Sequence, residues 1–144
     1  MIQLNLETCQ IIANEALARA SEMCLKPICV VILDNRASLR YCVNQDGTSI
    51  DRHRIAHGKA KAAMSLGIGT RALGDRAEVQ AYFIDAVGRM LDGDFIPVPG
   101  GVLVKNTTGE VLGAVGISGD LSDNDEKVAV AGIEAAGLSA DTGA

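Results

Sequence analysis

The chain has 144 residues, of which 48% are apolar and only 3% aromatic, and its formal net charge is −5. This length is that of one ordinary domain, so we expect residues 1–144 to form a single domain with a core of aliphatic side chains. The negative net charge argues against a surface that binds nucleic acid or an anionic membrane, because binding phosphate needs clustered Lys and Arg.

No segment of the sequence is long and apolar enough to be a membrane span. Charged residues such as Glu7 and Arg19 lie where a signal peptide would have its apolar core, so we expect a cytoplasmic protein. The cysteines form no CxxC pair of the kind that binds zinc or acts in redox catalysis, which predicts buried free thiols and no metal site. These cysteines are Cys9, Cys24, Cys29 and Cys42.

In chain order, the first predicted element is a helix that Asn5 caps and that runs to about Cys24. The β-branched run 28–33 has no polar alternation, which predicts a strand buried on both faces of a sheet. A turn at 34–36 then leads into a second strand over 38–44, which completes a hairpin.

The middle of the chain is predicted to be helical. Thr48 or Ser49 caps a second helix, which extends to about Leu66 and is closed by Gly67. Apolar residues at helical spacing predict a third helix over 75–90.

The last third of the chain is predicted to hold a second hairpin and a final helix. The Gly- and Pro-rich segment 92–101 is expected to be irregular, with a further short strand near Phe95 as an open alternative. Strands over 102–105 and 110–118 follow, and Ser122 is predicted to cap a helix with an unusually small apolar face. Hairpin strands and intervening helices together predict an α+β fold, with an antiparallel sheet flanked by helices on both faces. This arrangement is PAS- or profilin-like.

A series of short motifs runs in order through about 130 residues. It comprises Val30-Val-Ile-Leu-Asp34, Asp46-Gly47, Ala56 to Ala60 around Lys59, Thr70, Pro99-Gly100-Gly101, Gly113-Ala-Val-Gly-Ile-Ser-Gly119, Asp125-Glu126 and Ala131-Gly132-Ile133. In their order and spacing these motifs resemble the GlcG/HbpS family, which contains small α+β haem- or tetrapyrrole-associated proteins related to the PduO C-terminal domain. The resemblance implies a sheet of about five strands, haem as a cofactor, and a homo-oligomer such as an octamer. Some relatives have a haem-ligating His in the first helix, and this chain has none there.

Lys59 is the most informative single residue, because its helical neighbours at three and four positions are all apolar. A lysine on such a stripe must extend to solvent, pair with a carboxylate, or face a pocket. One interpretation is a structural ion pair with Asp34, Asp46 or Glu126. The other is that Lys59 binds a ligand carboxylate or propionate, or acts as an acid or base.

Four further residues are candidates for ligand binding. His53 and His57 lie four apart on the second predicted helix and share a face. That spacing can hold a metal ion, or one of the two could ligate haem iron, and the alternative is an ordinary solvated face. Gly100 and Gly101 could present backbone N–H groups to an anion, or form an ordinary tight turn.

Two functions follow from these residues. The first is a binding protein that holds haem or another planar or anionic molecule near Lys59, with Gly100, Gly101, His53 and His57 as further contacts. The alternative is a cofactor-free catabolic enzyme, a lyase, isomerase, hydrolase or dehalogenase that acts on a small organic acid. In that enzyme Lys59 would bind the substrate carboxylate, and Glu126 or Asp46 would move a proton.

Overall fold

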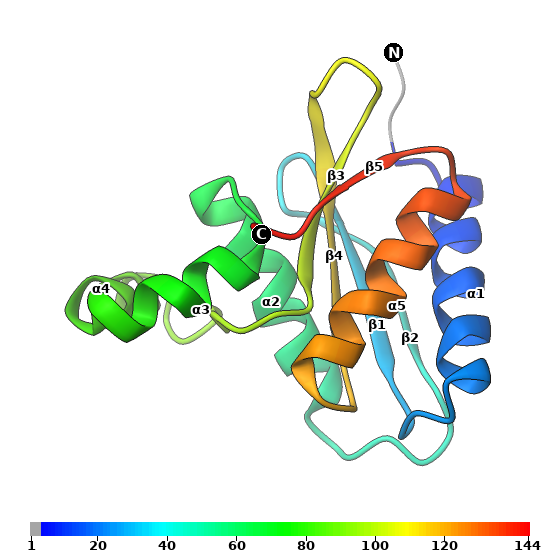
Figure 1. Ribbon diagram of the computed structural model, residues 1–144, viewed down its shortest axis with the longest axis horizontal. Helices are drawn as coiled ribbons and strands as arrows, with labels where there is room; N and C mark the ends of the chain where they lie inside the picture. The colour runs from blue at the N-terminus through cyan, green and yellow to red at the C-terminus, as the bar shows by residue number, and fades with distance from the viewer. Residues whose placement is uncertain (1–3) are drawn as a thin grey trace.

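The structure is a computed structural model that describes residues 4–144. Helices and strands follow one another as an α-β-β-α-α-α-β-β-α-β series (Figure 1). Their bounds are α1 Leu6–Glu22, β1 Cys29–Asp34, β2 Leu39–Asn44, α2 Arg52–Leu66, α3 Thr70–Val79, α4 Ala81–Met90, β3 Gly101–Lys105, β4 Val111–Ser118, α5 Ser122–Ala135 and β5 Ser139–Asp141.

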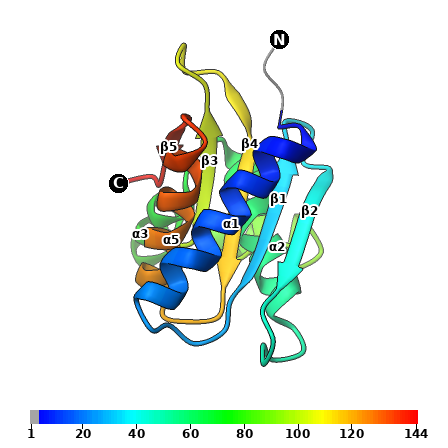
Figure 2. The same cartoon turned by 90° about the vertical axis from the view of Figure 1, so that its right-hand side faces the viewer.

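The five strands form one sheet in the order β2-β1-β4-β3-β5, and every neighbouring pair is antiparallel. Helices α1 and α5 cover one face, whereas α2 lies on the other and leads to α3 and α4, which extend away from the sheet (Figures 1 and 2). The predicted α+β fold, with an antiparallel five-stranded sheet between helical layers, is therefore confirmed.

The central strand β1 shows why helices must cover both faces of the sheet. Val30 and Ile32 point into the core beneath α1 and α5, while Val31 and Leu33 pack with the alanines of α2. All four side chains are buried, as the run without polar alternation predicts. The predicted cap of the first helix is also confirmed, because the Asn5 side chain accepts a hydrogen bond from the Thr8 backbone N–H at 2.9 Å.

The single helix predicted over 75–90 is wrong. The chain is already helical at Thr70, and it breaks at Gln80, whose backbone (φ −138°, ψ 53°) is not helical. Two short helices result, and the Arg76 guanidinium of α3 lies 3.8 Å from the centre of the Phe83 ring of α4. The break therefore lets the two helices pack together, which a continuous apolar periodicity does not reveal.

The alternative of a strand near Phe95 is also wrong. Phe95 is buried against α3 and α4, and the following Ile96 N–H donates to the Gly58 carbonyl of α2 at 3.0 Å. This segment therefore hydrogen-bonds to a helix and adds no strand to the sheet. The fifth strand is β5 at the other end of the chain, and its three residues are too few to give a sequence pattern.

Both predicted serine or threonine caps are wrong as well. Helix α2 begins at Arg52 after a turn at residues 50–51, and the Ser49 hydroxyl accepts from the Arg52 side chain at 3.2 Å and caps no backbone N–H. Helix α5 begins at Ser122 itself, and Leu121 occupies the capping position without a side-chain bond.

The small apolar face predicted for the last helix brings α5 close to α1. A Cβ atom added at Gly132 would collide with the backbone carbonyl of Ile12. In the described part of the chain, no helix has the length and apolar character needed to cross a membrane.

Candidate functional site

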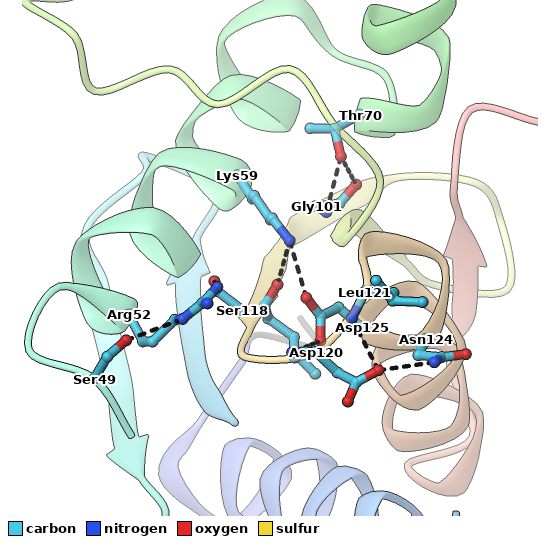
Figure 3. A network of polar contacts seen from close by, with 11 residues as sticks. Ser49, Arg52, Lys59, Thr70, Gly101, Ser118, Asp120, Leu121, Asn124 and Asp125 are labelled. Atoms are coloured by element: carbon cyan, nitrogen blue, oxygen red, sulfur yellow. Dashed lines mark hydrogen bonds and ion pairs between the residues drawn. The ribbon is translucent and has the colours of Figure 1, made fainter. Parts of the chain in front are cut away.

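Lys59 lies in the interior, between α2, β4 and α5 (Figure 3). Its ammonium group donates to the backbone carbonyl of Ile117 at 2.9 Å and to the carboxylate of Asp125 at 3.2 Å. Only 2% of Lys59 is exposed and Asp125 is fully buried. The predicted ion pair therefore exists, but its partner is Asp125 and not Asp34, Asp46 or Glu126.

Burial is the main cause of the pKa shifts of Lys59 and Asp125. It lowers the pKa of Lys59 and raises the pKa of Asp125, and the attraction between the two groups only partly opposes these shifts. The other carboxylate oxygen of Asp125 accepts the Asp120 backbone N–H at 3.1 Å. Within residues 4–144, no buried side-chain nitrogen or oxygen lacks a hydrogen-bond partner. The Lys59–Asp125 pair is thus buried, and both of its charged groups have hydrogen-bond partners.

The predicted paired glycines lie directly beside Lys59. A Cβ atom on Gly100 would be 2.8 Å from the Lys59 ammonium nitrogen, and one on Gly101 would collide with the Lys59 carbonyl. Thr70 fixes this turn, because its hydroxyl accepts the Gly101 N–H at 2.8 Å and donates to the Gly101 carbonyl at 3.2 Å. The glycines therefore let the start of β3 approach α2 closely.

The two other predicted proton-transfer residues have different surroundings. The Glu126 carboxylate accepts from the Arg71 guanidinium at 3.0 Å, in an ion pair that joins α5 to α3. Asp46 is exposed and borders a shallow cleft beside Pro27, which Lys59 does not line. The structure thus brings Lys59 together with Gly100 and Gly101, but gives no contact between Lys59 and either Glu126 or Asp46.

A separate groove lies between α2, the edge strand β2 and the segment that follows α4. Its volume is about 740 Å³, within the range of about 300–1,000 Å³ that is usual for small-molecule sites. Apolar and polar side chains share the lining: Val31, Leu39, Cys42, Asp51, His53, Arg54, Ile55, His57, Asp92, Asp94 and Ile96. Lys59 is not among them.

Both histidines line this groove, as their spacing of four on one helix allows. His53 is exposed, whereas His57 is half-buried and its Nδ1 lies 2.9 Å from a carboxylate oxygen of Asp94. An Asp beside Nδ1 favours the tautomer in which the proton is on Nδ1, which leaves the Nε2 lone pair free to bind a metal. The face of α2 that carries His53 and His57 is therefore only partly exposed to solvent.

The helical period explains why the groove and the ion pair are separate. His57 and Lys59 are two residues apart, which corresponds to a rotation of about 200° around the helix axis. One side of α2 therefore faces the groove, while the opposite side carries Lys59 toward β4 and α5. Although the two residues are close in the sequence, they therefore belong to different sites.

The prediction of buried free thiols holds for two of the four cysteines. Cys9 and Cys29 are buried, whereas Cys24 and Cys42 are exposed. Cys24 lies just after α1, and Cys42 lies on an edge strand whose α2-side face is only partly covered. Among residues 4–144, no group of three or more His, Cys, Asp or Glu side chains is placed to hold a metal ion.

No sequence pattern marks Asp94 as a site residue, and Asp125 stands out only as part of the Asp125-Glu126 motif. Asp94 is distant from His57 in the sequence and lies in an irregular segment, so no periodic pattern links them. Asp125 and Glu126 both lie near the start of α5, where carboxylates are favoured by the helix dipole. Only the orientation of α5 decides which of the two carboxylates points toward Lys59.

The sheet, its two helical layers and the lateral groove define a class of small α+β domain with a candidate ligand site beside its edge strand. The family model described as haem degrading protein HbpS-like matches residues 4–134, and the chain therefore belongs to the HbpS-like family. A comparison with curated proteins finds no match.

Solved structures of similar fold cover nearly the whole chain. The PduOC:heme complex has a TM-score of 0.86 and 22% identity, over 95% of this chain and 97% of that one. Klebsiella pneumoniae protein ORFY has a TM-score of 0.85 and 21% identity, over 95% and 93% of the two chains. A double mutant of Streptomyces reticuli HbpS has a TM-score of 0.77 and 24% identity, over 93% and 87%. At identities of 21–24%, these comparisons show that the fold is similar and no more.

Proposed function

We propose that this protein binds haem, or another planar anionic small molecule, in the groove between α2 and β2. One observation carries the proposal: the sequence contains two histidines, and both of them line this groove. The family description and the haem complex of a structural neighbour support haem as the first ligand to test.

The groove has the chemistry that a haem needs. Val31, Leu39 and Ile96 offer apolar contacts for a porphyrin plane, and His53 or His57 offers an imidazole for the iron. Arg54 also lines the groove, and its guanidinium lies 3.5 Å from a carboxylate oxygen of Asp51. When haem is bound, this guanidinium could pair with a propionate in place of Asp51. A bound haem would supply an iron centre whose reactivity depends on its axial ligand. The residues of this chain would hold it, orient it and limit its contact with water.

Titration of the reduced protein with haemin tests the proposal. We expect a shifted Soret band that saturates at one haemin per chain, a weaker band after His57→Ala, and none after His53→Ala plus His57→Ala. Tyr82→Phe is the matched control, because Tyr82 is exposed on α4 outside the groove and a phenolate can also ligate iron. An unchanged spectrum in the double histidine variant, or loss of the band in Tyr82→Phe, would contradict the proposed site.

The geometry gives less support to a ligand contact at Lys59, Gly100 and Gly101. Lys59 is closed off by its two hydrogen bonds, so a ligand would first have to displace Asp125. The alternative of a cofactor-free enzyme stays a prediction that no contact favours, since Glu126 is held by Arg71 and Asp46 lies at another cleft. Lys59→Met measured against candidate organic acids would test both ideas.

We also propose that the protein works as a cytoplasmic homo-oligomer, and an octamer is the expected size. Large apolar side chains stand exposed on α3 and α4, namely Val79, Tyr82 and Met90. Covering such side chains is a common reason for subunits to associate. Sedimentation velocity should show a single assembly, and Tyr82→Glu should shift it to smaller species. A monomeric wild-type protein at micromolar concentration would contradict this part of the proposal.

A further inference from the structure

Two thiols lie together at the edge of the sheet. Cys29 of β1 is paired with Asn44, and Cys42 of β2 is paired with Val31, so the two cysteines are diagonal neighbours on the sheet face that α2 covers. Their sulfur atoms are 4.0 Å apart and share a hydrogen bond. Neither thiol is proposed as a haem ligand, although Cys42 lines the same groove.

The two thiols differ in their access to solvent. Cys29 is fully buried, and burial, helped by the neighbouring Cys42 sulfur, raises the pKa of the Cys29 thiol to about 12. Cys42 is exposed and forms part of the groove lining. A soluble oxidant would therefore reach Cys42 first, while Cys29 stays a protonated neighbour that can donate its hydrogen to the Cys42 sulfur.

The strand that carries Cys42 is hydrogen-bonded to the sheet on one side only. β2 is the outer strand of the sheet, with β1 as its only neighbour in the described part of the chain. A disulfide requires the sulfur atoms to approach to about 2.05 Å. Side-chain rotation and a small shift of an edge strand would provide this approach, whereas a central strand would be fixed from both sides.

We propose that Cys29 and Cys42 form a reversible dithiol–disulfide pair that a hydroperoxide oxidises. The Cys42 thiolate attacks the hydroxyl oxygen of the peroxide, the O–O bond breaks, and Cys42 becomes a sulfenic acid. The hydroxide or alkoxide that leaves takes a proton from water. The Cys29 sulfur then attacks the Cys42 sulfur, and the departing hydroxyl takes the Cys29 proton as water. The two thiols are thus oxidised to one disulfide and the peroxide is reduced. The exposed thiol is thereby removed from the wall of the groove.

Thiol mapping on the full chain tests this pair. The reduced protein is treated with hydrogen peroxide, denatured, alkylated, digested and analysed by mass spectrometry. We expect two of the four cysteines to lose their label, a Cys29–Cys42 cross-linked peptide to appear, and dithiothreitol to restore both labels. Cys24 is the internal control, because it is exposed but makes no sulfur contact among the described residues.

Single variants separate the roles of the two thiols. In Cys29→Ala, Cys42 should accumulate as a sulfenic acid that dimedone traps, and in Cys42→Ser, Cys29 should keep its label after peroxide. The wild-type result alone decides the proposal if a variant fails to fold. If Cys42 is converted to sulfinic acid while Cys29 keeps its label, or if Cys42 links to Cys24 of another chain, the proposal is wrong.

Discussion

The two sides of helix α2 differ in how their polar groups are satisfied. On one side, Lys59 and Asp125 are buried, bonded to each other and to backbone groups, and closed to solvent. On the other side, His53 and His57 line an open groove. A charged residue on an apolar stripe is therefore not by itself evidence of a ligand site, since burial with a complete set of partners is its usual structural solution.

Removing one half of the closed pair should have the largest effect on stability. Lys59→Met leaves the Asp125 carboxylate buried without its partner, which we expect to lower the free energy of unfolding by about 3–5 kcal/mol. Lys61→Met on the same helix is the matched control, because Lys61 is only half-buried and forms no salt bridge among residues 4–144; it should change stability by less than about 0.5 kcal/mol. Urea denaturation measures both.

The same variant gives a pH test of the closed site. Without Lys59, the pKa of Asp125 in the folded state rises further above its value in the unfolded chain. The folded state then binds more protons than the unfolded state between these two pKa values, so stability falls as the pH rises through that window. Lys59→Met should therefore lose more stability at pH 8 than at pH 5. Equal losses at both values would mean that Asp125 is not buried as described.

A bulkier residue between α2 and the sheet should have the next largest effect. A Cβ atom on Gly116 of β4 would collide with the carbonyl of Ala56, so Gly116→Ala should destabilise the fold by about 1–3 kcal/mol. Gly88→Ala is the control, since its Cβ would lie 3.8 Å from the Phe95 ring, an ordinary contact. Thermal unfolding compares the two, and equal melting temperatures would contradict the close packing of α2.

On the open side, Asp94 should act through His57 and not through its own contact with the ligand. Loss of a carboxylate that orients a metal-binding imidazole typically costs about 10–100-fold in affinity. We therefore expect Asp94→Asn to weaken haemin binding by this amount while leaving the urea midpoint nearly unchanged. The redox potential of the bound iron should shift as well, a change that a purely structural role would not cause.

The smallest expected effect comes from Asp120, which lies next to the Lys59–Asp125 pair. Hydrogen bonds from the Asn124 side chain and from the Lys26 and Leu121 N–H groups lower the pKa of Asp120. Its contribution to stability is therefore present above the ordinary carboxyl pKa and is lost as the pH falls through the lowered value. Asp120→Asn should be slightly less stable at pH 6, and the difference should shrink toward pH 3.

Much of the fold could be predicted from the sequence, because the signals are local. The unbroken apolar run of β1, the Asn5 cap and the two hairpins each depend on residues close together in the chain. The break at Gln80 and the short strand β5 depend on packing between distant segments, so no periodicity marks them.

The site was harder to predict than the fold. The apolar stripe around Lys59 indicates a carboxylate partner or a pocket, but the partner in the structure, Asp125, depends on how α5 is rotated. Asp94 reaches His57 only because the irregular segment after α4 folds back over α2. The same fold-back places the groove away from Lys59. Residue types and spacing therefore located the relevant helix, but not the side of it that faces a ligand.

The most direct test of haem binding in the groove is a crystal structure of the protein grown with haemin. We expect porphyrin density between α2 and β2, with the iron bound to His53 or His57 and with the Lys59–Asp125 pair intact. Density at Lys59 and Gly100 with the ion pair broken, or iron bound by neither histidine, would contradict it.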